Sequence, residues 1–318
     1  IGKRTFSFQD MMRFQGGASS FISGRKQLTD LYSFAMDNTD VLENKSRFSA
    51  INFRQEINTK LDIEGYGIFS SLFSKTASES SIEYLQNSGV TFEERSSSGR
   101  NNSVLGIGNI KLNYTPNTKE KWYYNGQFQS STNDMNSVLN SARDGQLSSF
   151  ETLNKADNIQ IKQFVEWHKQ INKKQTTTLV VNQSYDNQKP INTWLTDTEF
   201  LTGLIPLAND TFYTIQQVKK VKNNSIDALF KHYWIINNFN HLYTNLGNNL
   251  GTTQLEITEK QYLTDGTIND FGSNGFGNDL DYLLNDLYLG LEYKFKIGKW
   301  VNKPAIYAHY FHLKTQQI

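Results

Sequence analysis

Hydrophobic and polar positions alternate along much of this chain. In residues 287–297, the odd positions carry Leu, Tyr, Phe and Ile, whereas the even positions carry Tyr, Gly, Glu and Lys. Residues 60–69 and 121–129 show the same alternation. A period of two places successive side chains on opposite faces of a β-strand. The pattern therefore predicts strands with one apolar and one polar face.

Less regular alternation predicts seven further strands. These candidates are residues 47–57, 104–114, 159–170, 175–185, 225–236, 241–250 and 305–314. Together they make about ten strands of roughly the 9–11 residues that cross a bilayer when a strand is tilted. The predicted fold class is all-β, an antiparallel transmembrane β-barrel with about ten up-and-down strands.

The predicted connections are alternately short and long. Short polar turns are centred near residues 58, 117, 172, 238 and 298, and long polar segments lie between them. Outer-membrane barrels have this arrangement, with short periplasmic turns and long external loops. We therefore expect residues 1–45 to be an external loop region before the first strand, and residues 46–318 to be a partial barrel. The expected long external loops are residues 75–103, 133–158, 187–224 and 251–286.

Aromatic residues gather beside the predicted short turns. Amphipathic rings at a constant height are typical of a membrane interface, where the ring is apolar and its N–H or O–H stays hydrated. The alternative explanation is that Tyr and Trp favour strands in general. We predict an aromatic girdle made of residues Tyr114, Trp122–Tyr124, Trp167, Tyr233, Trp234, Phe295, Trp300 and Tyr307.

Composition narrows the function classes. Hydrophobic residues make up 37% of the chain, and no run approaches the ~18 consecutive apolar residues of a membrane helix. Lys and Arg number 32 against 31 Asp and Glu, so the chain lacks the basic surface of a nucleic-acid-binding protein. The absence of Cys excludes disulfides, thiolate catalysis and cysteine-based metal sites.

No residue pattern predicts catalysis or a cofactor. The five His residues lack a metal-ligand spacing such as H-E-x-x-H. Asp265, Asp270, Asp279 and Asp281 surround the glycine-rich residues 271–279 and carry the oxygen ligands that Ca²⁺ takes, but not at the spacing of an EF-hand loop. An ordinary solvated loop is the preferred interpretation. We expect no enzyme activity, no cofactor and no metal.

Charged residues on the polar strand faces are the candidate functional residues. In a barrel they face a water-filled lumen, where they guide a substrate or hold an internal plug; simple solvation is the alternative. The lumen-facing candidates are Arg54, Asp62, Glu64, Lys111, Glu166, Glu292 and Lys294. The residues expected to face lipid are Leu61, Ile63, Trp122, Phe128, Leu289, Leu291 and Phe295.

Three stretches resemble a known family. SFQDMMRFQGG (residues 7–17), SRFSAINFRQEINTKLDIEGYGIFSS (residues 46–71) and DLYLGLEYKFKIGKW (residues 286–300) resemble the middle of the barrel of TonB-dependent outer-membrane receptors. The resemblance is to the group that has an N-terminal carboxypeptidase-regulatory-like domain, and it spans most of the chain. It implies a barrel of 22 strands, an internal plug domain and a TonB-type energy coupler in the cell envelope of a Gram-negative bacterium.

The expected function is part of the barrel of an outer-membrane receptor that imports a scarce nutrient. The chain begins with Ile1 and matches neither plug nor coupling segment, so we expect it to be a piece of a longer protein. The expected partners are outer-membrane lipid, the protein's own plug and coupler, and a surface lipoprotein. Two alternatives stay open: a barrel subunit that binds a surface lipoprotein or secretion partner, and a complete ten-stranded barrel.

Overall fold

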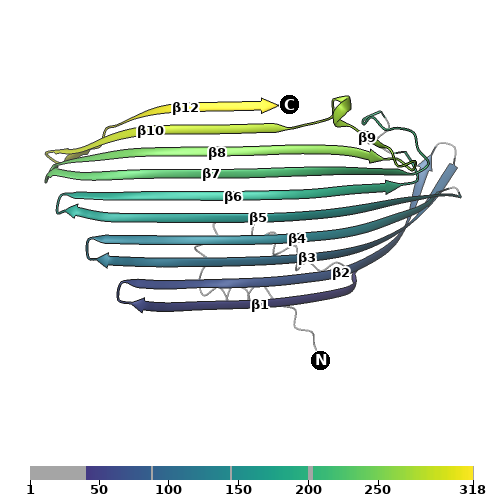
Figure 1. Cartoon of the computed structure of the whole chain (residues 1–318), viewed down its shortest axis with the longest axis horizontal. Helices are drawn as coiled ribbons and strands as arrows, with labels where there is room; N and C mark the ends of the chain where they lie inside the picture. Colours follow the sequence, from purple (N-terminus) through teal and green to yellow (C-terminus); the bar gives the residue numbers. More distant parts are fainter. Residues whose placement is uncertain (1–40, 87–88, 144, 200–202, 318) are drawn as a thin grey trace.

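The computed structural model describes residues 41–86, 89–143, 145–199 and 203–317. These residues form one antiparallel sheet, in which each long strand pairs with the next along the chain (Figure 1). The predicted all-β class with antiparallel up-and-down strands is confirmed, whereas closure of these strands into a barrel stays a prediction. Ten strands are long: β1 (Val41–Asn58), β2 (Leu61–Gln86), β3 (Gly89–Asn117), β4 (Glu120–Arg143), β5 (Gln146–Asn172), β6 (Gln175–Thr196), β7 (Tyr213–Asn237), β8 (Asn240–Tyr262), β10 (Leu280–Ile297) and β12 (Ala305–Gln317).

Three short elements complete the described chain. Strand β9 (Ile268–Asp270) pairs with β8, and β11 (Trp300–Asn302) pairs with β10. A single-turn 3₁₀ helix, η2 (Gly272–Asn274), follows β9. Among the described residues, the structure contains no helix with the length and hydropathy of a membrane span.

The strands are longer than predicted. The long strands have 13–29 residues, and much of the chain expected as external loops at 75–103 and 133–158 continues β2 to β5. These segments are rich in Ser and Asn on both faces, so they lack the alternation that marks a half-buried strand. Cross-strand backbone hydrogen bonds still form, because they do not depend on apolar side chains.

The expected boundaries are also displaced at other points. β1 begins at Val41, before the predicted start at residue 46, and residues 1–40 lie outside the described residues. Irregular chain is confined, within the described part, mainly to the connections between β6 and β7 and between β8 and β10. The five predicted short turns are present as tight connections at one rim of the sheet (Figure 1).

The pairing register gives the strands a regular stagger. Gly65, Gly126, Gln183 and Leu250 lie in one row across the sheet. They lie 4, 6, 8 and 10 residues beyond the first residues of β2, β4, β6 and β8, so the stagger is two residues per hairpin. Two residues per hairpin is one residue per strand. If the short turns all lie at the same height, this stagger corresponds to a strand tilt of about 35°. This tilt is within the range of transmembrane barrels.

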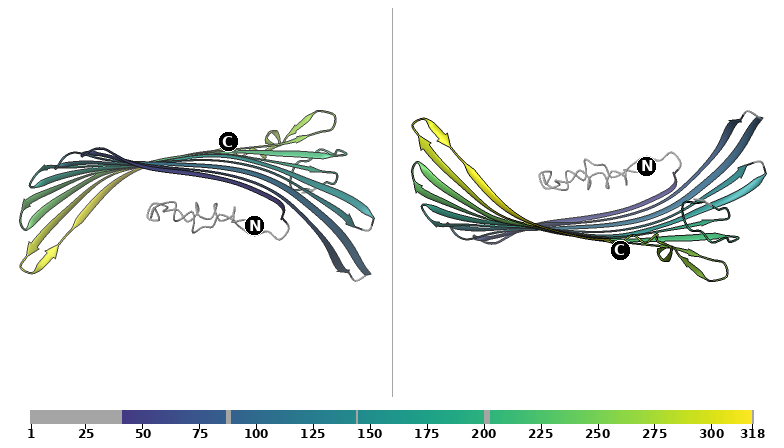
Figure 2. Two further views of the ribbon diagram at one scale, coloured as in Figure 1. Left: turned by 90° about the horizontal axis from the view of Figure 1, so that it is seen from below. Right: turned by 90° about the horizontal axis from the view of Figure 1, so that it is seen from above.

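The sheet is a single twisted layer. Figure 2 shows it edge-on, with the strand ends splayed at both rims. β1 and β12 lie at opposite edges in Figure 1, and each pairs with one neighbour among the described strands. The described sheet is therefore open, with two unpaired edges.

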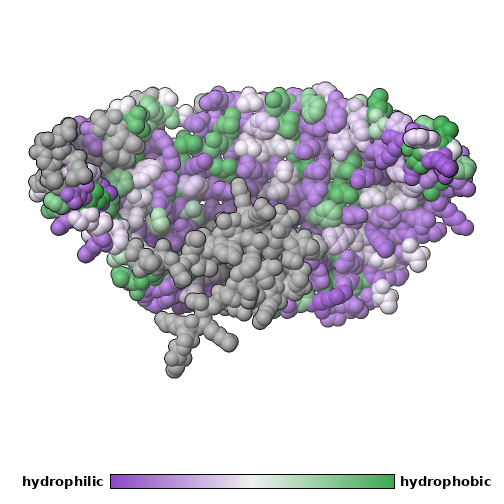
Figure 3. Space-filling view, turned by 180° about the vertical axis from the view of Figure 1, so that it is seen from behind, coloured by the Kyte–Doolittle hydropathy of each residue, from purple (hydrophilic) through white to green (hydrophobic). Residues whose placement is uncertain are grey.

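A one-layer sheet has almost no core. The chain exposes 21199 Å², whereas a compact monomer of this mass exposes ~13,500 Å². Among the residues that the structure describes, the buried hydrophobic ones are Ile68, Leu105, Tyr213, Ile215 and Phe271. Figure 3 shows one broad side of the sheet, where hydrophilic residues predominate in the uncovered parts and hydrophobic ones lie in scattered groups. Such a sheet needs other material against its apolar side chains.

Candidate functional site: two chemically different faces and their hairpin extensions

The register places all seven lumen-facing candidates on one face, here called the polar face. Arg54, Glu64 and Lys111 lie in one row, and Asp62 and Glu166 lie in the adjacent row. The second row continues to Tyr288 in β10, and Glu292 and Lys294 follow it at even spacing on the same face. That the polar face lines a lumen stays a prediction.

Charges on the polar face neutralise one another across strands. An Arg54 nitrogen lies 2.9 Å from a carboxylate oxygen of Asp62, and Lys111 Nζ lies 2.8 Å from Glu64 Oε1. The Arg54 side chain is 64% exposed, so water screens its pair with Asp62, whereas Lys111 is only 13% exposed. Both pairs join neighbouring strands on the polar face.

The opposite face, here called the apolar face, carries all the residues expected to face lipid. Residues paired across neighbouring strands lie on the same face. Successive pairs connect Leu61 with Trp122 and Ile63 with Tyr124, and they connect Phe128 with the odd-numbered residues of β10. Phe128 and Leu289 are each 47% exposed in this chain. The two predicted sets of residues thus lie on opposite faces of the sheet, whereas contact with lipid stays a prediction.

A charge-free belt crosses the apolar face on every long strand. On this face, Asp, Glu, Lys and Arg are absent from residues 49–57, 61–73, 102–114, 122–132, 159–167, 175–187, 224–234, 240–254, 283–297 and 306–312. Nine residues of a strand tilted by about 35° rise ~24 Å, which matches the height of the apolar band of outer-membrane barrels. Where these segments contain Asp, Glu, Lys or Arg, the charged residue lies on the polar face.

Aromatic residues of the apolar face cluster near the short turns. Trp122 and Trp167 have ring centroids 5.7 Å apart, and both indole N–H groups donate to Glu120 Oε1. Tyr114 and Trp234 lie at similar distances from their turns. We also expected Tyr123, Tyr233 and Tyr307 in the girdle. They lie on the polar face instead, because each is an odd number of residues away from the apolar-face positions of its strand.

Beyond the belt, an ionic network links the extended hairpins. Glu93 is 6% exposed and accepts hydrogen bonds from Tyr84 Oη and Arg95 Nε, each at 2.6 Å, and from Ser141 Oγ. The guanidinium of Arg143 lies 4.7 Å from the centroid of the Tyr84 ring. The hydrogen bonds from Arg95, Ser141 and Tyr84 lower the pKa of Glu93 to about 2. Strands β2, β3 and β4 are thus joined by side chains as well as backbone.

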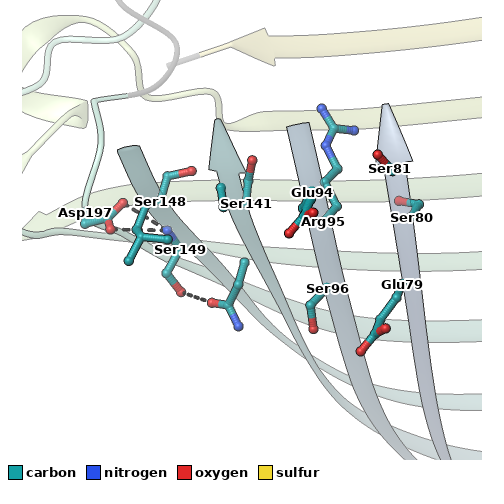
Figure 4. A pocket seen from close by; sticks show the side chains of 13 residues that line it. Glu79, Ser80, Ser81, Glu94, Arg95, Ser96, Ser141, Ser148, Ser149 and Asp197 are labelled. Atoms are coloured by element: carbon teal, nitrogen blue, oxygen red, sulfur yellow. Dashed lines mark hydrogen bonds between the residues drawn. The ribbon is translucent and has the colours of Figure 1, made fainter. Parts of the chain in front are cut away.

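The other side of these hairpin extensions carries an open pocket of about 670 Å³ (Figure 4). It is lined mainly by serines and by the carboxylates of Glu79, Glu94 and Asp197. Both carboxylate oxygens of Asp197 accept from the backbone N–H of Ser149, at 3.1 and 3.2 Å. This contact fixes the chain after β6 to β5, so Asp197 has a structural role.

The connections beyond β6 and β8 pack around a buried glutamine. Gln261 is fully buried; its amide accepts from Ala208 N and donates to Ala208 O, both at 2.8 Å. Asp210 accepts from the backbone N–H of Thr264 at 2.7 Å. These bonds hold the connection between β6 and β7 against the end of β8.

The aspartates considered as calcium ligands have other partners. Asp265 accepts from Thr267 N at 2.8 Å, Asp270 pairs with Lys260 at 3.0 Å, and Asp279 accepts from Ile257 N at 3.2 Å. Within the described ranges, the structure brings together no group of three or more His, Asp or Glu side chains that suits a metal ion. These three aspartates therefore bind backbone N–H groups or a neighbouring lysine.

One site was not found from the sequence. Tyr243, Tyr288 and Tyr307 surround a pocket of about 340 Å³ on the polar face, here called the tyrosine pocket. Lys231, Asn245, Glu292 and Lys303 also line it. The available signal was the parity of the three tyrosines, which places aromatic rings on the otherwise polar side of their strands.

Comparison with solved structures shows weak similarity to two kinds of outer-membrane barrel. The siderophore receptor PiuA from Acinetobacter baumannii aligns with a TM-score of 0.21 and 7% identity over 86% of this chain and 64% of its own. The translocator domain of the autotransporter NalP from Neisseria meningitidis aligns with a TM-score of 0.21 and 10% identity over 95% of both chains.

A second receptor gives a similar result. The ferric preacinetobactin receptor BauA from Acinetobacter baumannii aligns with a TM-score of 0.22 and 8% identity over 86% of this chain. The chain thus spans less than two thirds of the length of the two receptors, 64% and 62%. No known protein family and no curated protein matches the sequence.

Proposed function

We propose that this chain forms part of the transmembrane wall of an outer-membrane β-barrel receptor that imports a scarce nutrient. The assignment of the chain to a transmembrane wall rests on the charge-free belt. A bilayer core penalises Arg or Lys on the lipid face by about 2–4 kcal/mol at mid-depth, whereas a watery lumen does not. The restriction of charge to one face, over a height that fits a bilayer, is the distribution that this difference in free energy selects.

The import role rests on a different observation. The stretches at residues 46–71 and 286–300 resemble the barrels of TonB-dependent receptors, and both lie in the belt strands. Such a receptor pairs a polar wall with an internal plug and with external segments that capture the ligand. The hairpin extensions of β2 to β5 supply such segments, held rigid by the Glu93 network.

Spin labelling tests the wall. Because the chain contains no Cys, single cysteines are unique labelling sites in these residues. Labels at Phe128 and Leu289 in the full protein, reconstituted in vesicles, should be more accessible to oxygen than to a water-soluble nickel quencher. Labels at the adjacent Gln127 and at Glu292 should show the reverse. Equal accessibility at all four positions contradicts the membrane assignment.

Uptake tests the receptor role separately. A strain that lacks the full protein should grow poorly under limitation of its nutrient, and the wild-type protein should restore growth. A version in which residues 79–96 are replaced by a short turn should reach the outer membrane but fail to restore growth, because the capture segment is missing. Full restoration by this variant contradicts import through these hairpins.

A further inference from the structure

The tyrosine pocket lies where β7, β8, β10 and β12 present their polar face. Tyr243 and Glu292 are directly paired, and Tyr307 is paired with Gly290. At about 340 Å³, the pocket is at the small end of the range for ligand sites. It has room for a single ring of a larger ligand.

Two glycines let the tyrosine rings lie directly against the sheet. A Cβ on Gly247 would come within 2.1 Å of the Tyr288 ring, and a Cβ on Gly290 would come within 2.4 Å of the Tyr307 ring. Each ring therefore lies against the backbone of a neighbouring strand. The Tyr288 ring is also stacked on His309, with ring centroids 5.2 Å apart, whereas Tyr307 is 46% exposed. The exposed ring of Tyr307, held in this way, forms a flat, rigid surface on which another ring stacks at little entropic cost.

Glu292 organises the polar side of the pocket. Its side chain is 15% exposed, pairs with Lys303, and accepts from Tyr307 Oη and, at 3.3 Å, from Asn245 Nδ2. Lys303 Nζ also lies 4.8 Å from the centroid of the Tyr243 ring. One carboxylate thus positions an ammonium, a phenol and an amide around the same cavity.

Lys231 adds a positive charge that Glu292 does not neutralise. It lines the same pocket and has no ion pair among the residues described. The pocket therefore holds two ammonium groups and one carboxylate, which favours a ligand with a single negative charge. Strongly anionic ligands are disfavoured, because Glu292 lies in the wall and Asp286 is two residues from Tyr288.

We propose that the tyrosine pocket binds one sugar ring that carries a carboxylate, a uronic acid unit of an acidic glycan. The C–H face of such a ring stacks on Tyr307, its hydroxyls bond to amide and phenol groups, and its carboxylate pairs with Lys231. This inference rests on the proposed function, because it names the substrate class of the same wall. A ferric tris-catecholate is the competing aromatic ligand, but its size and multiple negative charges suit the pocket poorly.

Calorimetric titration of the full protein in detergent tests the pocket. The ligands are a galacturonic acid trimer, a neutral galactose trimer and a ferric tris-catecholate complex. The wild-type protein should bind the acidic trimer most tightly. Lys231→Met should weaken acidic-trimer binding about tenfold and leave neutral-trimer binding unchanged, because one charge-assisted bond is lost. Tyr307→Ala should weaken both trimers, and Lys219→Met, on the same strand and face but outside the pocket, should change neither.

The outcomes separate this inference from the proposed function. Heat-modifiable migration on gels identifies variants that fold. Failure of the wild-type protein to bind the acidic trimer, unchanged binding in folded Lys231→Met, or tighter binding of either other ligand overturns the pocket assignment. If spin labels still divide between lipid and water in that case, the wall assignment stands and only the sugar proposal fails.

Discussion

Neighbouring residues on these strands experience different surroundings. Phe128 is on the apolar face and Gln127 is on the polar face, although they are adjacent in sequence. At a given height in the bilayer, the consequence of placing a charge therefore depends on the parity of the position. Such a pair offers a substitution test in which position along the strand is almost constant.

Phe128→Arg should destabilise the full protein in vesicles by about 2–4 kcal/mol, because the guanidinium would lie in hydrocarbon. Gln127→Arg, the matched control, should change the free energy of unfolding little, because its side chain faces the polar side. Denaturant unfolding in lipid vesicles measures both. Equal losses in the two variants would contradict the assignment of faces.

Glu93 gives the hairpin extensions a dependence on pH. Its pKa is lowered to about 2 from an ordinary value of 4.5 in the folded hairpin. A lowered folded-state pKa stabilises the fold above the unfolded-state value, and that contribution is lost as pH falls through the folded-state value. The hairpins should therefore loosen between about pH 4.5 and pH 2.

Hydrogen exchange of residues 92–96 at acidic pH measures this loosening. Glu93→Gln should already be loose at neutral pH and should lose most of the pH dependence. Glu94→Gln is the control, since Glu94 is on the other face and outside the network. An unaltered pH profile in Glu93→Gln would show that the network does not hold the hairpins.

At the scale of elements, glycines and aromatic rings fit together across strands. Gly247→Ala should destabilise the sheet by about 1–3 kcal/mol, because its Cβ overlaps the Tyr288 ring. Gly251→Ala, four residues further along β8, should be tolerated, because no side chain lies within 4 Å of the added Cβ. Thermal unfolding of both variants measures the difference, and equal melting temperatures would contradict this packing.

Gln261 should control the connection between β6 and β7. Gln261→Leu leaves the N–H and C=O of Ala208 without partners and should cost about 1–3 kcal/mol. Exchange of backbone amides in residues 207–215 should rise. Gln254→Leu replaces an exposed glutamine of the same strand and should have no such effect. Protection unchanged in Gln261→Leu would show that the clamp is dispensable.

The alternation of apolar and polar side chains supplied most of the prediction of the fold. It failed where the physical contrast between the two faces of a strand is missing. Where one face is apolar, as in residues 287–297, period two predicted both the strand and its faces. Where both faces are polar, as in residues 89–103, pattern gave no signal, although backbone pairing extends the strand. The tyrosine pocket depends on register between β8, β10 and β12, which a single sequence does not encode locally.

At the scale of the whole molecule, the sheet requires partners along both edges. β1 and β12 each expose a row of backbone N–H and C=O groups in the described sheet. A bilayer leaves such groups unsatisfied at several kcal/mol each, so a spanning sheet must close. Closure requires either pairing of β1 with β12 or additional strands between them. The receptor proposal requires additional strands.

Cysteine crosslinking decides between the two modes of closure. In the full protein, Leu289→Cys with Ala308→Cys should form a disulfide under mild oxidation, because these residues are paired between β10 and β12. Ala50→Cys on β1, combined in turn with Tyr307→Cys, His309→Cys and Phe311→Cys, should form none, since further strands separate the edges. The β12 set samples three successive positions on the polar face, so a small error in register would not hide a contact. An efficient disulfide between β1 and β12 would instead establish a closed barrel of ten strands, whose lumen is too narrow for the plug that the receptor proposal requires.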